Sequence, residues 1–138
     1  MISRSCALLL LLVGVFGGTA CDNAASPSVT PTAGTWAGTT AAGDPVSFTV
    51  SNGAIASLTV RVRVSGSCPQ SAIQTNFVVT FPITGSTFST GSGQGTNVNG
   101  TFTSSTRANG TASVTTSVGT GGQSCNSTGQ TTWTASKQ

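Results

Sequence analysis

The chain has no histidine, glutamate or tyrosine, and its 138 residues carry only two acidic and five basic side chains. General acid–base catalysis relies mostly on His, Glu and Asp. After residue 33 the single carboxylate side chain is that of Asp44. A glycosidase needs two carboxylates beside the scissile bond, and a nucleophilic serine needs a neighbouring base. The composition therefore predicts a protein that is not an enzyme and that uses no cofactor.

The sequence also lacks a dense cluster of positive charge. A nucleic-acid-binding surface needs several Lys or Arg side chains close together, because they displace the counterions of the phosphates. The basic residues here are scattered along the chain, and they are Arg4, Arg61, Arg63, Arg107 and Lys137. The sequence pI near 9.0 therefore reflects the shortage of acids. Nucleic acid is not an expected partner.

No hydrophobic run is long enough to span a bilayer comfortably, which takes about 20 residues. The longest apolar stretch runs from Ala7 to Phe16, after the positive charge of Arg4, and small residues precede Cys21. This layout is typical of a cleaved export signal. We expect residues 1–20 to be a signal peptide.

The tetrad Gly18-Thr19-Ala20-Cys21 resembles the lipobox of bacterial lipoproteins. The match covers only this segment, and Gly18 stands where the family usually has a bulkier aliphatic residue. The resemblance implies that Cys21 is acylated on sulfur, becomes the first residue after cleavage and anchors the protein in a membrane. The implied location is the cell envelope, facing the periplasm or the exterior. An ordinary secretory signal cut before Cys21 is the alternative.

The number of cysteines agrees with this interpretation. Of the four, Cys6 would leave with the signal, and Cys68 and Cys125 lie deep in the remaining chain, where they can form a disulfide in an oxidising compartment. Cys21 would then be left over for the lipid. A free or intermolecularly bridged Cys21 is the alternative. A metal site is not expected, because two cysteines without histidine supply too few ligands for zinc.

Thr, Ser and Gly make up nearly half of the chain, but the apolar residues after residue 33 fall into short runs rich in Val, Ile and Phe. Such runs, separated by Gly, Asn and Ser, predict β-strands. We expect residues 21–33 to be the lipidated cysteine and a flexible tether, and residues 34–138 to be one all-β domain. The predicted fold is a small antiparallel β-sandwich or barrel of about eight strands. The expected strands are 34–40, 46–50, 54–64, 76–83, 86–89, 98–104, 109–118 and 130–135.

Local patterns add detail to this prediction. Asn52-Gly53 tolerates positive φ at two successive residues and predicts a tight hairpin. Leu58, Val60, Val62 and Val64 alternate with polar residues and are expected to face the core. Three Asn-X-Thr strings, at residues 99–101, 109–111 and 126–128, match the glycosylation sequon, but we interpret them as turns.

Few residues are candidates for a binding site. Trp36 and Trp133 share the faces of other apolar residues, which favours the core; the alternative is an exposed platform that stacks on sugars. Arg61 and Arg63 are expected on a solvated strand face, with contact to anionic lipid or polysaccharide as the alternative. Asp44 is expected to cap its own turn, with weak calcium binding as the alternative.

These observations predict a non-catalytic, membrane-anchored envelope lipoprotein whose β domain serves binding or structural roles. Its expected partners are a lipid bilayer, through acylated Cys21, and a polysaccharide or an envelope protein. A carbohydrate-binding module on a lipid tether, or a freely secreted β-domain protein, is the alternative.

Overall fold

The computed structural model of the chain describes residues 28–120 and 123–138, and these residues form an all-β fold without an α-helix. The predicted fold class is confirmed. The described residues form ten strands, two more than expected, and one short 3-10 helix. They are β1 (Gly34–Thr40), β2 (Pro45–Ser51), β3 (Ala54–Arg63), β4 (Ser65–Gly66), β5 (Ala72–Phe77), β6 (Phe81–Pro82), β7 (Thr87–Ser89), η1 (Gly93–Gly95), β8 (Thr96–Ser104), β9 (Arg107–Thr120) and β10 (Gln123–Lys137).

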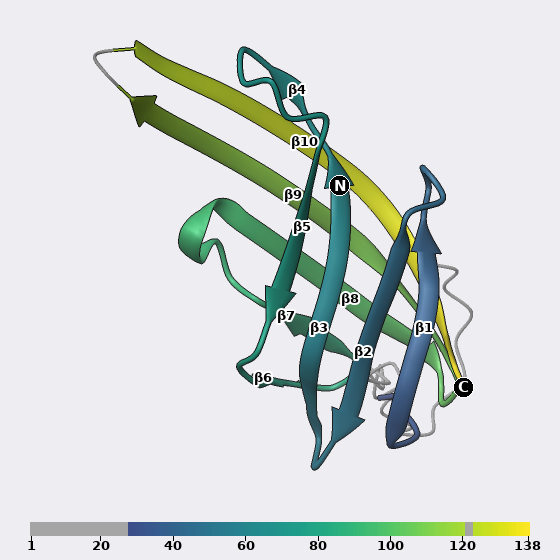
Figure 1. Cartoon of the computed structure of the whole chain (residues 1–138). Helices are drawn as coiled ribbons and strands as arrows, with labels where there is room; N and C mark the ends of the chain where they lie inside the picture. Colours follow the sequence, from purple (N-terminus) through teal and green to yellow (C-terminus); the bar gives the residue numbers. More distant parts are fainter. Residues whose placement is uncertain (1–27, 121–122) are drawn as a thin grey trace, which may run out of the picture.

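All ten strands belong to one antiparallel sheet that bends back over itself. The strand order is β5-β3-β2-β1-β10-β9-β8-β7, while β4 pairs with β10 and β6 with β3. The first and last strands are neighbours, with Thr40 opposite Trp133 and Trp36 opposite Lys137. In Figure 1, β1, β2, β3 and β5 form a front layer, and β8, β9 and β10 cross behind it. The inner faces of the two layers enclose the core.

The hairpin between β2 and β3 forms where the sequence predicts it. Asn52 and Gly53 both have positive φ, 50° and 71°, and Ser51 pairs with Ala54 across the turn. Two successive residues of this conformation give the turn the same right-handed twist as its strands. The turn prediction is confirmed.

The inward face of β3 contains one irregularity. The pairing of β2 with β3 shifts between Ser47 and Thr49, and Ser57, on the opposite strand, has a φ of +52°. A bulge of this kind adds one residue to a strand and reverses the side-chain alternation beyond it. Ile55 and Leu58 are therefore both buried although three positions separate them. The predicted burial of Leu58, Val60, Val62 and Val64 is confirmed.

Aromatic rings fill the middle of the core. Phe48 contacts four others: it stacks on Trp36 at 5.6 Å and lies between 6.0 and 6.3 Å from Phe88, Phe102 and Trp133. Offset and edge-to-face pairs in this range stabilise a core by about 0.5–1.5 kcal/mol each beyond the buried area. The cluster joins residues of both layers and holds the fold of the sheet together.

The strands expected at 98–104 and 109–118 are confirmed, and two of the predicted turns lie within them. Gly100 in β8 pairs directly with Gly110 in β9, so Asn-Gly-Thr at 99–101 and 109–111 lies within the sheet. A Cβ at Gly100 would overlap the Phe88 ring, and one at Gly110 would overlap the Asn99 carbonyl oxygen and the Trp133 ring. The glycines thus make room for aromatic rings over the backbone. The third string, 126–128, lies in β10, so the turn interpretation is wrong for all three.

The predicted strand 76–83 is wrong as well. The structure divides this region into β5 (Ala72–Phe77) and β6 (Phe81–Pro82), with residues 78–80 outside any strand. Both pieces pair with the same edge of β3: Leu58 lies opposite Phe77, and Ile55 lies opposite Phe81. Pro82 stands at the end of its short strand, as its missing N–H requires.

The folded domain begins before the expected boundary at residue 34. The Val29 backbone N–H donates to Ser86 Oγ at 2.7 Å, and the Thr32 N–H donates to the Ser105 carbonyl oxygen at 2.9 Å. The Val29 side chain packs against the core. Residues 28–33, which the sequence placed in the tether, are therefore attached to the domain. Residues 21–27 of the expected tether lie outside the described part of the chain, as does the signal segment 1–20.

Candidate functional site

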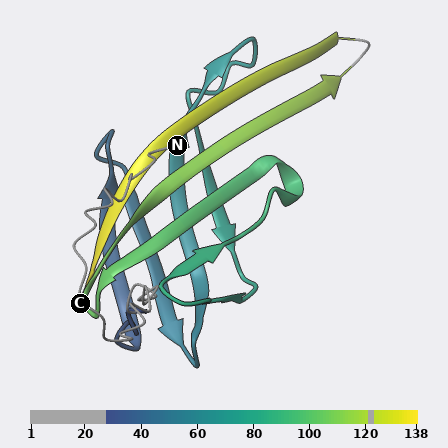
Figure 2. The same cartoon turned by 180° about the vertical axis from the view of Figure 1, so that it is seen from behind.

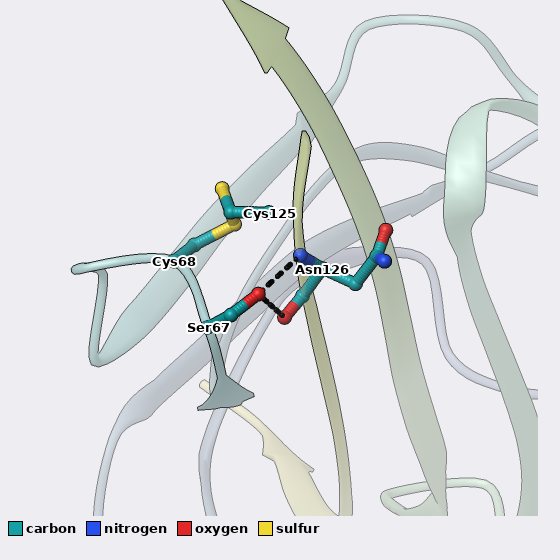
Figure 3. The surroundings of a disulfide bond; sticks show 4 residues. All are labelled: Ser67, Cys68, Cys125 and Asn126. Carbon is teal, nitrogen blue, oxygen red and sulfur yellow. Dashed lines mark hydrogen bonds between the residues drawn. A yellow bond between two sulfur atoms is a disulfide. The ribbon is translucent and has the colours of Figure 1, made fainter. Parts of the chain in front are cut away.

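The predicted disulfide is present. Cys68 and Cys125 are bonded, with their Cα atoms 4.9 Å apart and a sequence separation of 57. Cys68 follows β4, and Cys125 lies near the start of β10 (Figure 3). The bond joins the loop after β4 to the start of β10, at the end of the β9–β10 hairpin where the two strands are connected.

This end of the β9–β10 hairpin extends beyond the neighbouring strand β8. The partner of Thr96, the first residue of β8, is Val114, so residues 115–120 of β9 continue past the start of β8. We call residues 115–120 and 123–128 the hairpin arm; it reaches past the other strands in Figures 1 and 2. Beside the disulfide, Ser67 Oγ accepts from the Asn126 N–H at 2.9 Å, and the Ser67 N–H donates to the Asn126 carbonyl oxygen at 2.8 Å. The disulfide and these hydrogen bonds hold the arm against β4.

The hairpin arm forms one wall of a groove. A shallow groove of about 460 Å³ lies between the loop after β4 and the arm, next to the disulfide. Its lining includes Pro69, Gln70 and Val118, and Val118 is 49% exposed. None of the residues that line this groove is charged.

Both tryptophans lie in the core. Trp36 is 0% exposed and Trp133 is 1% exposed. The Trp36 Nε1–H donates to the Thr32 carbonyl oxygen at 3.0 Å, whereas Trp133 Nε1 is buried without a hydrogen-bond partner. A ring that stacks on a sugar must present one face to solvent, and neither indole does. The alternative of a sugar platform built from these two residues is therefore removed.

The arginines of β3 are exposed, and one of them forms an ion pair that the sequence did not indicate. Arg63 Nε donates to Asp44 Oδ2 at 2.9 Å, and Arg63 Nη2 donates to the Ala42 carbonyl oxygen at 3.2 Å. The pair ties the turn between β1 and β2 to β3. This hydrogen bond, and then the charges of Arg63 and Arg61, lower the pKa of Asp44 below its usual value despite some desolvation. The same bond raises the pKa of Arg63.

The ion pair favours neither interpretation of Asp44. The carboxylate contacts a guanidinium rather than backbone N–H groups of its own turn, and Thr40 is the residue that caps the turn, because its Oγ1 accepts from the Asp44 N–H at 3.1 Å. A lone carboxylate already occupied by arginine is a poor ligand for calcium. Among residues 28–120 and 123–138, no three His, Cys, Asp or Glu side chains come together as metal ligands do. Arg61 is exposed and remains available for contact with an anionic surface.

Cys21 lies outside the described residues, so its lipidation stays a prediction. Where the chain is described, it contains no helix long and apolar enough to cross a membrane.

The structure has one surface feature that the sequence did not predict. A cleft of about 320 Å³ lies beside β5, between Phe77 and Phe81 on one side and Thr90 and Thr96 on the other. Val78 and Val79 border it. No pattern in the sequence indicated it, because Phe77, Val79 and Phe81 alternate as they would on the inner face of one regular strand. The interruption after β5 leaves the two valines outside.

The fold and these features define a disulfide-linked, single-sheet β domain. Comparisons with models of protein families, with curated proteins and with solved structures find no match to the chain.

Proposed function

We propose that the chain is an exported, non-catalytic lipoprotein that is anchored to a membrane through an acylated Cys21 and holds its β domain in the cell envelope. The observation that carries this proposal is the Cys68–Cys125 bond. With these two cysteines joined, and with Cys6 removed together with residues 1–20, the mature chain keeps Cys21 without an intramolecular partner. An acyl chain on sulfur accounts for that thiol.

The same bond supports export. Disulfides persist in the periplasm and outside the cell and are rare in a reducing cytosol. The described domain also begins close behind the anchor, because Ser28 and Val29 follow Cys21 by only seven and eight positions. A single acyl chain binds membranes weakly, and the two or three chains of a mature bacterial lipoprotein make the attachment stable.

The polar surface of the domain supports a binding or structural role over a chemical one. The outer face of β8, β9 and β10 is covered by exposed hydroxyl and amide side chains, with Arg107 as its charged residue. These residues are Asn99, Thr101, Thr103, Asn109, Thr115, Ser117, Asn126, Thr128, Gln130, Thr132, Thr134 and Ser136. A polysaccharide or an envelope protein would meet this face. The sugar-binding alternative has lost the two indoles on which it depended.

The test is the intact mass of the mature protein extracted from membranes, before and after reduction. The expected mass is that of residues 21–138 plus acyl groups, with two hydrogens gained on reduction. In a Cys21→Ser variant the acyl mass should disappear and the protein should leave the membrane fraction, whereas Cys6→Ser should change neither. An unmodified chain that begins at Cys21, or one that keeps residues 1–20, would refute the anchor.

A further inference from the structure

The most exposed large apolar side chains of the described domain are neighbours in the sequence. Val78 is 91% exposed and Val79 is 57% exposed, and both follow the last residue of β5. They border the cleft beside β5 together with Phe77 and Phe81, whose rings pack edge to face at 5.5 Å and are only partly buried. We call residues 77–81 the valine corner. An exposed apolar patch of this kind marks a surface that contacts a partner or a membrane.

The valine corner lies away from the hairpin arm. β5 begins opposite Arg63, close to β4, which pairs with the arm, and it ends opposite Leu58. β6 then continues along β3 as far as Ala54, the first residue of that strand. In Figures 1 and 2, β6 lies near the end of the molecule opposite the tip of the arm. The third exposed valine, Val118, belongs to the arm and therefore lies far from the other two.

The chain that leads back to Cys21 leaves the domain on the side of this corner. The Val29 N–H donates to Ser86 Oγ at 2.7 Å, and Ser86 lies in the turn that joins β6 to β7. Ser28 follows Cys21 by seven positions, which span at most about 25 Å when fully extended. An acyl anchor on Cys21 would thus hold the β6–β7 turn, and the corner that leads into β6, close to a bilayer.

No charged side chain near the corner has to lose water if the corner meets a bilayer. The segment 64–106 contains no charged residue, and β3 is uncharged from Ala54 to Val60, the part that pairs with β6 and with the end of β5. Residues 78–80 lie outside any strand, so their backbone groups depend on water, which the hydrocarbon core lacks. The contact is therefore shallow: the valine side chains reach the acyl boundary while the backbone stays among the headgroups.

We propose that the valine corner is a membrane contact: Val78 and Val79 enter the outer layer of the bilayer that holds the lipid anchor, and they orient the domain with the hairpin arm pointing away from it. This inference rests on the proposed anchor at Cys21, because the short chain from Cys21 to Ser28 is what brings the corner to a bilayer. Two valines alone bind a membrane weakly. The anchor makes their contact an intramolecular step with a high effective concentration.

The test supplies the anchor chemically, so that it does not depend on natural acylation. The oxidised chain 21–138 is coupled through the Cys21 thiol to a maleimide phospholipid in phosphatidylcholine vesicles, and its amide exchange is followed by mass spectrometry. The reference is the same chain with Cys21 blocked by N-ethylmaleimide, in solution without vesicles. Exchange in residues 78–80 should slow by about fivefold on the vesicles. Gln70 and Ser71, which also lie outside any strand but at the arm end of β5, should exchange at an unchanged rate.

Two variants at exposed valines complete the test. Val78→Asp should abolish the slowing, because a carboxylate resists transfer out of water. Val118→Asp is the matched control and should slow as the wild type does, and both variants should keep the wild-type thermal midpoint. Unchanged exchange of residues 78–80 on the vesicles would overturn the proposal, as would a slowing that survives Val78→Asp. So would a slowing in the blocked chain that grows with its concentration, because it would reveal a second copy as the partner. Missing natural acylation would appear in the intact mass instead, so the two proposals fail separately.

Discussion

Two glycines within β9 illustrate how single residues control this fold. Gly110 faces the core beneath Trp133, whereas no atom lies within 4 Å of the place where a Cβ would stand on Gly119. Neither has a positive φ, so backbone conformation does not separate them. Any difference in stability between alanine variants at the two positions must therefore come from packing.

We therefore predict opposite outcomes for the two alanine variants. Gly110→Ala would press a methyl group into the Asn99 carbonyl oxygen and the indole, and it should lower the free energy of unfolding by about 2–3 kcal/mol. Gly119→Ala should leave that free energy unchanged or raise it by up to about 1 kcal/mol, because it restricts the unfolded chain. Urea unfolding followed by tryptophan fluorescence measures both. Equal midpoints for the two variants would contradict the packing of Trp133 over Gly110.

The ion pair of Asp44 with Arg63 predicts a dependence on acid. The folded-state pKa of Asp44 is lowered, so the pair contributes stability above the ordinary aspartate pKa of about 3.9, and this contribution is lost as the pH falls through the lower folded value. The free energy of unfolding should decrease between about pH 5 and pH 3.

Asp44→Asn should flatten this decrease, and Asp22→Asn is the control, since it removes the other acidic side chain and lies outside the described domain. The other titratable groups of the chain are common to both variants and cancel in the comparison. Urea midpoints measured at several acidic pH values test this prediction. An unchanged slope in Asp44→Asn would show that the ion pair does not persist in solution.

At the scale of elements, the position of the hairpin arm depends on the Cys68–Cys125 disulfide. β4 contributes only two residue pairs to β10, with Ser127 opposite Gly66 and Thr128 opposite Ser65. The disulfide closes a long loop, and in the chain-entropy model such a bond stabilises a protein by about 4 kcal/mol. Reduction should lower the free energy of unfolding by that order and speed amide exchange in residues 123–128 more than in the β8–β9 pairing.

A control variant separates the covalent bond from the hydrogen bonds beside it. Ser67→Ala removes the side-chain contacts with Asn126 and should cost only about 0.5–1.5 kcal/mol. Urea unfolding with and without reductant measures both effects. If reduction shifted the midpoint no more than Ser67→Ala does, the loop-closure argument would fail.

Local chemistry explains which elements the sequence predicts correctly. Asn52-Gly53 needs only its own backbone preferences to form a turn, and the turn is where the pattern places it. The same Asn-Gly pair at 99–100 and 109–110 lies in strands, because the Phe88 and Trp133 rings, distant in sequence, need the space of two glycines. The break between β5 and β6 likewise depends on the pairing of both strands with one edge of β3, and no local sequence pattern predicts it. The disulfide was predictable, since only two cysteines occur after residue 33.

At the scale of the whole molecule, both ends of the domain are tied to the sheet. β1 pairs with β10, and the segment before β1 contacts two turns, at Ser86 and at Ser105. These contacts place the first described residues beside the β6–β7 corner and the β8–β9 turn. The hairpin arm lies at the opposite end of β9 and β10 from that turn (Figure 1). A lipid on Cys21 would therefore leave the arm on the side of the domain that faces away from the membrane.

The docked segment also sets how far the domain can stand from its anchor. If residues 28–33 stay attached, seven residue steps separate Cys21 from Ser28, and these span at most about 25 Å when fully extended. Val29→Ala should lower the free energy of unfolding by about 1 kcal/mol, because it removes partly buried methyl groups from the core. Thr30→Ala changes an exposed neighbour and should shift it by less than about 0.5 kcal/mol. Equal urea midpoints for both variants would mean that the segment detaches in solution, and the domain could then move some 20 Å farther from the membrane.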